Sequence, residues 1–186
     1  VFGELRAIRT LDVRPSTGGK VVEVAANFLD GGAVTAGDVL LRIDPTDAQT
    51  ALARVRADLS DAEAELREAT RGLTLAQDEL AIASEQARLR QASLTRQRDL
   101  AERGVGTAAA VEAAELAVSS ANQATLARRQ SIAQAEARLD QAMSRKDRLA
   151  IDLAEADRAV ADTTVTATFD GILSKVSLVE GGRVSS

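Results

Sequence analysis

The chain has no cysteine, histidine, tryptophan or tyrosine, and among its 186 residues only Phe2, Phe28 and Phe169 are aromatic. Without cysteine there is no disulfide framework, and without cysteine or histidine the usual zinc ligands and nucleophile–imidazole pairs are missing. The many carboxylates are spread along helix surfaces, and no phosphate-cradling loop occurs. We therefore expect no enzymatic activity, no catalytic residues and no cofactor or metal site.

Long apolar runs and clustered positive charge are also missing. No stretch approaches the roughly 18 to 20 apolar residues of a membrane-spanning helix, so we expect any membrane anchor to lie outside this segment. The formal net charge is −5, and the three lysines, at positions 20, 146 and 175, form no cluster. Because nucleic-acid binding needs clustered Lys and Arg, we expect no nucleic-acid partner. The chain begins at Val1 rather than Met, and we interpret it as a piece of a larger protein.

What the sequence has in quantity is a seam of small and large apolar residues between Asp44-Pro45 and Asp162-Thr163. The seam alternates steps of three and four, which is the 3.5-residue period of a left-handed coiled coil. It consists of Leu52, Val55, Leu59, Ala62, Leu66, Ala69, Leu73, Ala76, Leu80, Ala83 and Ala87, and then of Thr125, Arg128, Ile132, Ala135, Leu139, Ala142, Lys146, Leu149, Leu153, Ala156 and Val160. At Arg128 and Lys146 we expect the aliphatic stems to cover the seam while the charges reach water or a nearby carboxylate.

The two runs of the seam mirror each other about Gly104-Val105-Gly106. The symmetry places Leu52 opposite Val160 and Leu73 opposite Leu139, which predicts an intramolecular antiparallel hairpin. Asp44 is a good N-cap, and Pro45 suits the first helical position. We expect the first helix to run to about residue 103, where Gly104 ends it. Thr107 then caps a second helix that runs to about residue 162.

Short alternating segments between glycine turns predict β-strands on both sides of the hairpin. They cover residues 19–24, 27–34 and 37–44 on one side, and 171–176 and 180–184 on the other. An acidic residue, Gly-Gly, any residue and Val recur in both flanks, at Asp30–Val34 and Glu180–Val184. Because each half is too small to bury a core alone, we expect the two halves to fold against each other.

These half-motifs resemble the halves of a lipoyl or biotinyl carrier domain. A lipoyl domain split by a long helical hairpin is typical of the periplasmic adaptor, or membrane fusion, proteins of bacterial efflux and secretion systems. The matching pieces are Val13-Arg14-Pro15-x-x-x-Gly19, Asn27–Gly31, Leu41–Pro45 and Ala167–Gly171, with Thr168 in place of the family's more usual proline. The resemblance covers nearly the whole segment.

The predicted fold class is α+β, with a long antiparallel coiled-coil hairpin inserted between the halves of a small β-rich, lipoyl-like domain. We expect an N-terminal strand over residues 1–14, leading from a membrane-proximal or β-barrel region outside this segment. Residues 15–44 and 163–186 would be the two lipoyl-like halves. Residues 45–162 would form the hairpin, with its tip at 104–107.

Around the tip the resemblance is most specific. Adaptors of drug-exporting pumps carry an Arg, a Leu four residues on and a Ser seven residues further; this chain has Arg96, Leu100 and Thr107 at those positions. The resemblance implies that these three residues dock to a TolC-type outer-membrane channel. Taken one at a time, Thr107 is explained as an N-cap, Leu100 as the last seam layer and Arg96 as a solvated charge.

A second row, Leu75, Ile82 and Leu89, repeats every seven residues beside the seam and ends in register with Arg96. It either broadens the seam or packs against a neighbouring hairpin. The resemblance implies self-assembly into a ring, as a trimer of dimers or a hexamer.

The resemblance further implies a non-enzymatic adaptor in the periplasm, anchored to the inner membrane and bridging a transporter there to the outer-membrane channel, for export of drugs or other substrates. An RND pump or an ABC exporter is favoured over an MFS transporter. The alternatives are an adaptor of type I secretion or of an MFS-type exporter, or a coiled-coil scaffold without a transport role. A covalent carrier domain is disfavoured, because the turn that would present a modified lysine is replaced by the hairpin.

Overall fold

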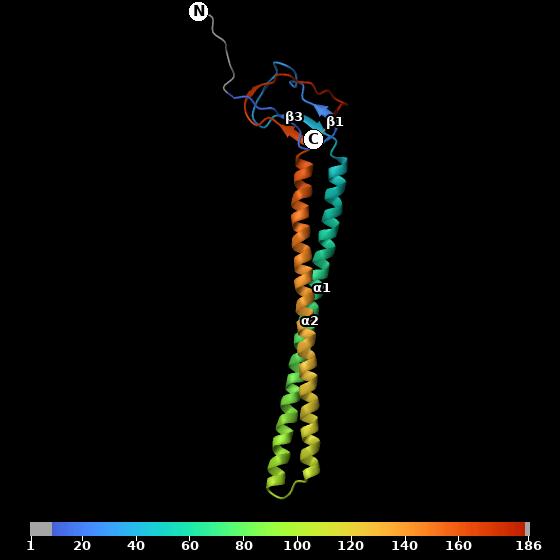
Figure 1. Cartoon of the computed structure of the whole chain (residues 1–186), viewed down its shortest axis with the longest axis vertical. Coiled ribbons are helices and arrows are strands. Elements are labelled where there is room, and N and C mark those ends of the chain that lie inside the picture. Colours follow the sequence, from blue (N-terminus) through green and yellow to red (C-terminus); the bar gives the residue numbers. More distant parts are fainter. Residues whose placement is uncertain (1–8, 185–186) are drawn as a thin grey trace, which may run out of the picture. The chain divides into compact units, whose positions relative to one another are not determined.

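The computed structural model describes residues 9–184, which form two long helices and six short β-strands (Figure 1). Strands β1 (Gly19–Val24), β2 (Ala33–Val34) and β3 (Val39–Ile43) precede helices α1 (Thr46–Glu102) and α2 (Ala108–Ala161), and β4 (Thr164–Thr166), β5 (Gly171–Ile172) and β6 (Arg183–Val184) follow them. There are two compact units. One joins the strands to the helix segments up to Ala57 and from Ile151, and the other is the hairpin segment Asp58–Ala150.

The strands of the two chain halves pair with each other. One sheet has the order β4-β3-β1-β6 and a second pairs β2 with β5, and all the pairings are antiparallel. Of the four pairings only β1 with β3 lies within one half, whereas β1–β6, β3–β4 and β2–β5 each join the halves. The predicted fold class, with the hairpin inserted between two halves of one β domain, is therefore confirmed.

The repeated Gly-Gly motif makes equivalent hydrogen bonds in the two halves. In the first half, the Gly31 amide donates to the Leu173 carbonyl at 2.8 Å, and the Leu173 amide donates to the Gly32 carbonyl at 2.8 Å. In the second half, the Gly181 amide donates to the Val21 carbonyl at 2.9 Å, and the Val21 amide donates to the Gly182 carbonyl at 2.8 Å. Each glycine turn thus binds a strand of the opposite half, which is why neither half needs a core of its own.

Two apolar clusters fill the β domain. The first has buried Val21, Leu41 and Ile43 at its centre, and the second has buried Val34, Leu40 and Ala167. Phe28 and Val165 pack against both clusters. The two share side chains from both chain halves, so the core is complete only when the halves meet.

The predicted N-terminal strand falls partly outside the described residues, since residues 1–8 are not among them. Over residues 9–14 the backbone is in no strand, and the first strand of the described chain is β1. Arg9 instead places its guanidinium over the ring of Phe169, at 5.6 Å from the centroid.

Local chemistry sets the start of α1 as predicted. Asp44 Oδ1 accepts hydrogen bonds from the Thr46 hydroxyl at 2.6 Å and from the Thr46 amide at 3.0 Å. These two bonds, the hydroxyl's first, hold the pKa of the Asp44 carboxyl below its ordinary value. The ionised carboxylate is the form that satisfies the otherwise unpaired amides of a helix N-terminus.

The seam between the helices follows the predicted positions but continues further toward the tip. Ala62, Ala76, Ala83 and Ala142 are buried, as expected for seam residues. The expectation that the strict seam ends at Ala87 is wrong, because Leu94, seven residues on, is only 4% exposed. The seven-residue step therefore continues in α1 beyond Ala87, although Arg90, at the intermediate seam position, is exposed.

Ion pairs between the helices agree with the antiparallel register that the seam sets. Arg145 contacts Glu65 at 2.9 Å, and Arg128 contacts Glu79 at 3.0 Å. These pairs join positions that the mirror symmetry brings to nearby levels of the hairpin. As expected, the Arg128 charge reaches a carboxylate from a seam position. Within the described residues, neither helix has an apolar segment long enough to cross a membrane.

The register predicts one specific cross-link. Ala76 is buried and Ala135 is half-buried, and both line the same groove between the helices. Replacing both with Cys should give an intramolecular disulfide with unchanged helicity, since both are small residues of facing seam layers. Gel mobility without reductant and circular dichroism measure the two outcomes. Bonds formed only between chains would contradict the antiparallel register.

Candidate docking surfaces of the hairpin

The turn between the helices is built by two glycines. Gly104 has φ of +80°, its amide donates to the Ala101 carbonyl at 3.0 Å, and the Val105 amide donates to the Leu100 carbonyl at 3.1 Å. This is a Schellman motif, which ends α1 by satisfying its last carbonyls. A side chain on Gly106 would bring Cβ to 2.7 Å from the Ala101 nitrogen, so glycine is required there for a steric reason.

Thr107 caps α2 as predicted. Its hydroxyl accepts a hydrogen bond from the Ala110 amide at 3.2 Å, which is the N3 position of the helix. The side chain is exposed. Capping accounts for a hydroxyl at this position, and the exposure leaves the methyl group available to a partner.

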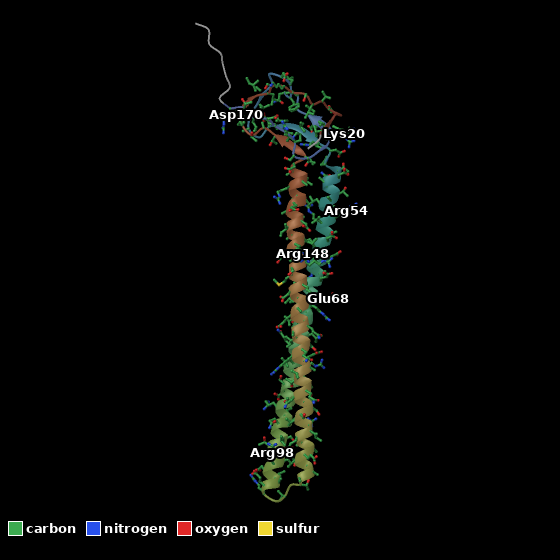
Figure 2. All side chains as sticks on the ribbon, viewed as in Figure 1. Lys20, Arg54, Glu68, Arg98, Arg148 and Asp170 are labelled. Atoms are coloured by element: carbon green, nitrogen blue, oxygen red, sulfur yellow. The ribbon has the colours of Figure 1, made fainter. Side chains whose placement is uncertain are left out.

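Arg96 and Leu100 lie one turn apart on α1, close to the turn. Arg96 is exposed, and among the described residues it makes no ion pair within 4.0 Å. Its neighbours differ: Arg98, seen near the turn in Figure 2, contacts Glu115 at 2.7 Å, and Arg103 contacts Asp99 at 2.8 Å. Arg96 is thus an arginine near the turn whose charge is not neutralised within the hairpin.

Leu100 has a partly structural role. Its carbonyl accepts both the Val105 and the Gly106 amides, but its side chain is 40% exposed. The apolar side chain does not close a dry seam layer, and it lies beside an exposed Val105. An apolar contact next to the Arg96 charge is therefore available at this end of the hairpin.

The row Leu75, Ile82 and Leu89 does not belong to the seam. The side chains are 61%, 70% and 55% exposed, whereas the seam alanine Ala83 is 8% exposed. A monomeric hairpin gains little by placing large apolar side chains in water at heptad spacing. Of the two explanations left open by the sequence, the broadened seam is not what the hairpin forms.

The structure has a further surface that was not predicted from the sequence. An open groove near the tip is lined by Leu94, Glu115, Val118, Ser119, Asn122, Gln123 and Leu126. The available signal was the run of α2 from Leu116 to Ala127, which has no charged residue although 27% of the chain is charged. Exposed helix surfaces are usually charged, so an uncharged exposed run indicates a contact surface.

No protein-family model matches the chain. It is 32% identical over 172 residues to the multidrug resistance protein MdtN of Shigella flexneri, covering 87% of this chain and 50% of that protein. The chain therefore spans about half the length of the curated relative that it matches.

Among solved structures, the chain is similar to MacA from Actinobacillus actinomycetemcomitans, with a TM-score of 0.53 and 22% identity over 96% of this chain and 46% of that one. It is also similar to the periplasmic adaptor protein EmrA, with a TM-score of 0.42 and 16% identity over 90% of this chain and 66% of that one. The likeness to MacA extends over both the β domain and the hairpin.

Proposed function

We propose that this chain, which belongs to the non-enzymatic periplasmic adaptor (membrane fusion) proteins, bridges an inner-membrane transporter to a TolC-type outer-membrane channel. The observation that carries the proposal is the pairing of two lipoyl-like halves across residues 44–163. A scaffold or stalk needs the coiled coil but has no use for a β domain assembled from both of its ends.

The tip is the proposed docking site for the channel. Arg96, Leu100 and Thr107 supply a charge that is not paired within the hairpin, an exposed apolar side chain and an exposed hydroxyl cap at one end. A channel that presents carboxylates or carbonyl oxygens beside an apolar surface would bind this combination.

For the exported substrate we propose drugs, in agreement with the name of the relative MdtN. The partner transporter is an RND pump or an ABC exporter, with an MFS exporter or a type I secretion system as the second candidate. The protein acts in the periplasm, held to the inner membrane by a segment outside this chain. Self-assembly into a ring, as a trimer of dimers or a hexamer, completes the export complex, with Leu75, Ile82 and Leu89 packing against a neighbouring hairpin.

In vivo photo-crosslinking tests the bridging role. A photoreactive residue in place of Val105, which is 74% exposed at the turn, should capture an outer-membrane channel when the protein carrying this chain is expressed in its own host. The same residue in place of Met143, which is 48% exposed on α2 far from the turn, is the matched control. Capture of the channel from both positions, or from neither, would contradict docking through the tip.

A further inference from the structure

One face of α1, continued by Arg103 directly after the helix ends at Glu102, carries a row of seven residues spaced by seven. From the β-domain side toward the turn the row reads Asp61, Glu68, Leu75, Ile82, Leu89, Arg96 and Arg103. All seven side chains are exposed. Two acids therefore precede three apolar residues, and two arginines follow them, on a single helix face.

Most charges of this row are not neutralised inside their own hairpin. Within the described residues Asp61, Glu68 and Arg96 make no ion pair within 4.0 Å, although other charges of the hairpin do, such as Glu65 with Arg145. Figure 2 shows Glu68 on the middle part of the hairpin. An apolar patch with complementary charges at its rim fits an interface with another chain.

The row is complementary to itself when reversed. We infer that two copies of this chain pair along it, with their α1 helices antiparallel and a two-fold axis at Ile82. Ile82 then faces its own copy, and Leu75 faces Leu89. Glu68 faces Arg96, and Asp61 faces Arg103, which also contacts Asp99 of its own chain at 2.8 Å, so acids meet bases at both ends of an apolar centre. Two identical helices keep the same spacing, so every layer matches.

A small residue beside the row leaves room for the second helix. Gly72 lies inside the helix, where glycine costs about 1 kcal/mol relative to alanine, and a Cβ there would meet no atom within 4 Å. Packing within the hairpin therefore does not require this glycine. In the antiparallel pair, Gly72 lies level with Ala92 of the second copy, so small residues face each other beyond both ends of the apolar centre.

A neighbour whose hairpin points the same way fits less well. The register of the hairpin places Ile82 level with Gln130 of α2, and Leu89 level with Gln123. Leu75 is level with Ala137, so the apolar centre of the row would meet alanine and glutamine there rather than a matching apolar row. Glu68 and Arg96 would face Ser144 and Leu116, so neither charge would be neutralised.

This pairing covers Arg96, which is also a residue of the docking site proposed above. A chain paired along the row cannot present Arg96 to a channel, so the antiparallel dimer is a resting form that excludes docking. Two copies anchored in one membrane form it only with their hairpins lying along that membrane. Ring assembly and the resting dimer use the same leucines and exclude each other.

Cysteine scanning of the 186-residue chain tests the pairing, helped by the absence of native cysteine. Ile82→Cys should form a disulfide-linked dimer on mild oxidation, because position 82 meets itself at the two-fold axis. Leu75→Cys alone should not, since its copy lies roughly 21 Å away along the helix. A mixture of Leu75→Cys and Leu89→Cys chains of different mass should give the mixed dimer. Met143→Cys is the control for random collision.

Charge exchange tests the direction of pairing. By sedimentation equilibrium, Glu68→Arg or Arg96→Glu alone should weaken the dimer roughly tenfold or more, and the double variant should recover it. Circular dichroism should show the same helicity for all of them. A double variant as weak as the single ones would overturn the proposal. So would cross-linking of Ile82→Cys no faster than Met143→Cys, or cross-linking of Ile82→Cys to Gln130→Cys instead of to itself. Export measurements do not enter, so failure here leaves the proposed docking untouched.

Discussion

Arg96→Asp is expected to abolish export in cells while leaving the protein folded. Arg96 is exposed, and no described residue pairs with it, so the substitution removes no core contact and no ion pair. We expect the free energy of unfolding to change by less than about 0.5 kcal/mol, the usual range for surface sites. At the proposed contact with a channel, the same change would place a carboxylate against groups that bind an arginine, which costs several kcal/mol at a packed interface.

Three other variants make this result specific. Arg71→Asp carries the same charge change on an exposed position of α1 far from the turn, and it should export normally. Leu100→Ala should have a milder effect, since the backbone carbonyl that accepts the turn amides remains. Thr107→Ala should be milder still and should cost roughly 1 kcal/mol of stability as a lost cap. Normal drug resistance with Arg96→Asp at normal expression would refute docking through this residue.

The hairpin was predictable because its determinants are local. Asp44, Gly104 and Thr107 act on amides and carbonyls within a few residues, so their roles can be inferred from residue type and position alone. The seam depends only on spacing. The predicted seam ended at Ala87, one layer too early, because the seven-residue step continues to the buried Leu94.

The pairing of strands in the β domain was less predictable from the sequence. The repeated Gly-Gly motif indicated two similar halves, but the partner of each strand depends on contacts between residues far apart in sequence. The hydrogen bond from the Ala36 amide to Asp170, at 2.7 Å, and that from the Val176 amide to Asp30, at 2.7 Å, are examples. Each aspartate caps a turn of the opposite half, which no periodicity within one half can reveal.

For the candidate site, the positions of the residues were predicted from the sequence, but their exposure was not. The resemblance to the family's tip motif pointed to Arg96, Leu100 and Thr107, at positions counted from a turn that the sequence defines. Exposure was not readable from spacing: Leu75 and Leu73 are both leucines near the seam, but only Leu73 is part of it. Distinguishing them requires knowing which side of α1 faces α2, and that depends on how the two helices pack against each other.

The two halves should also respond unequally to one substitution, which makes Gly32→Ala the sharpest test of the β domain. A Cβ at position 32 would lie 1.9 Å from the Asn27 carbonyl oxygen and 3.0 Å from that of Leu29. Both are backbone atoms, so no side chain can rotate away. The turn must open, and with it the bonds to Leu173 that join the halves. We expect the β domain to lose about 3 kcal/mol or more.

Neighbouring glycines supply the controls for that loss. Gly31 has φ of +85° but no atom within 4 Å of a Cβ, so Gly31→Ala should cost only the roughly 1 to 2 kcal/mol of a left-handed residue. Gly182 is the counterpart of Gly32 in the second half, and its Cβ would approach the Val179 carbonyl oxygen to 3.0 Å, so Gly182→Ala should be milder than Gly32→Ala. Hydrogen exchange read by mass spectrometry reports β1 and β3 separately from the hairpin segment Asp58–Ala150. Gly32→Ala should cost these strands more protection from exchange than Gly31→Ala or Gly182→Ala. The hairpin amides should keep their protection, because they belong to the other compact unit. Equal losses for Gly31→Ala and Gly32→Ala would mean that backbone conformation, and not the close contact with Asn27, selects glycine in this motif.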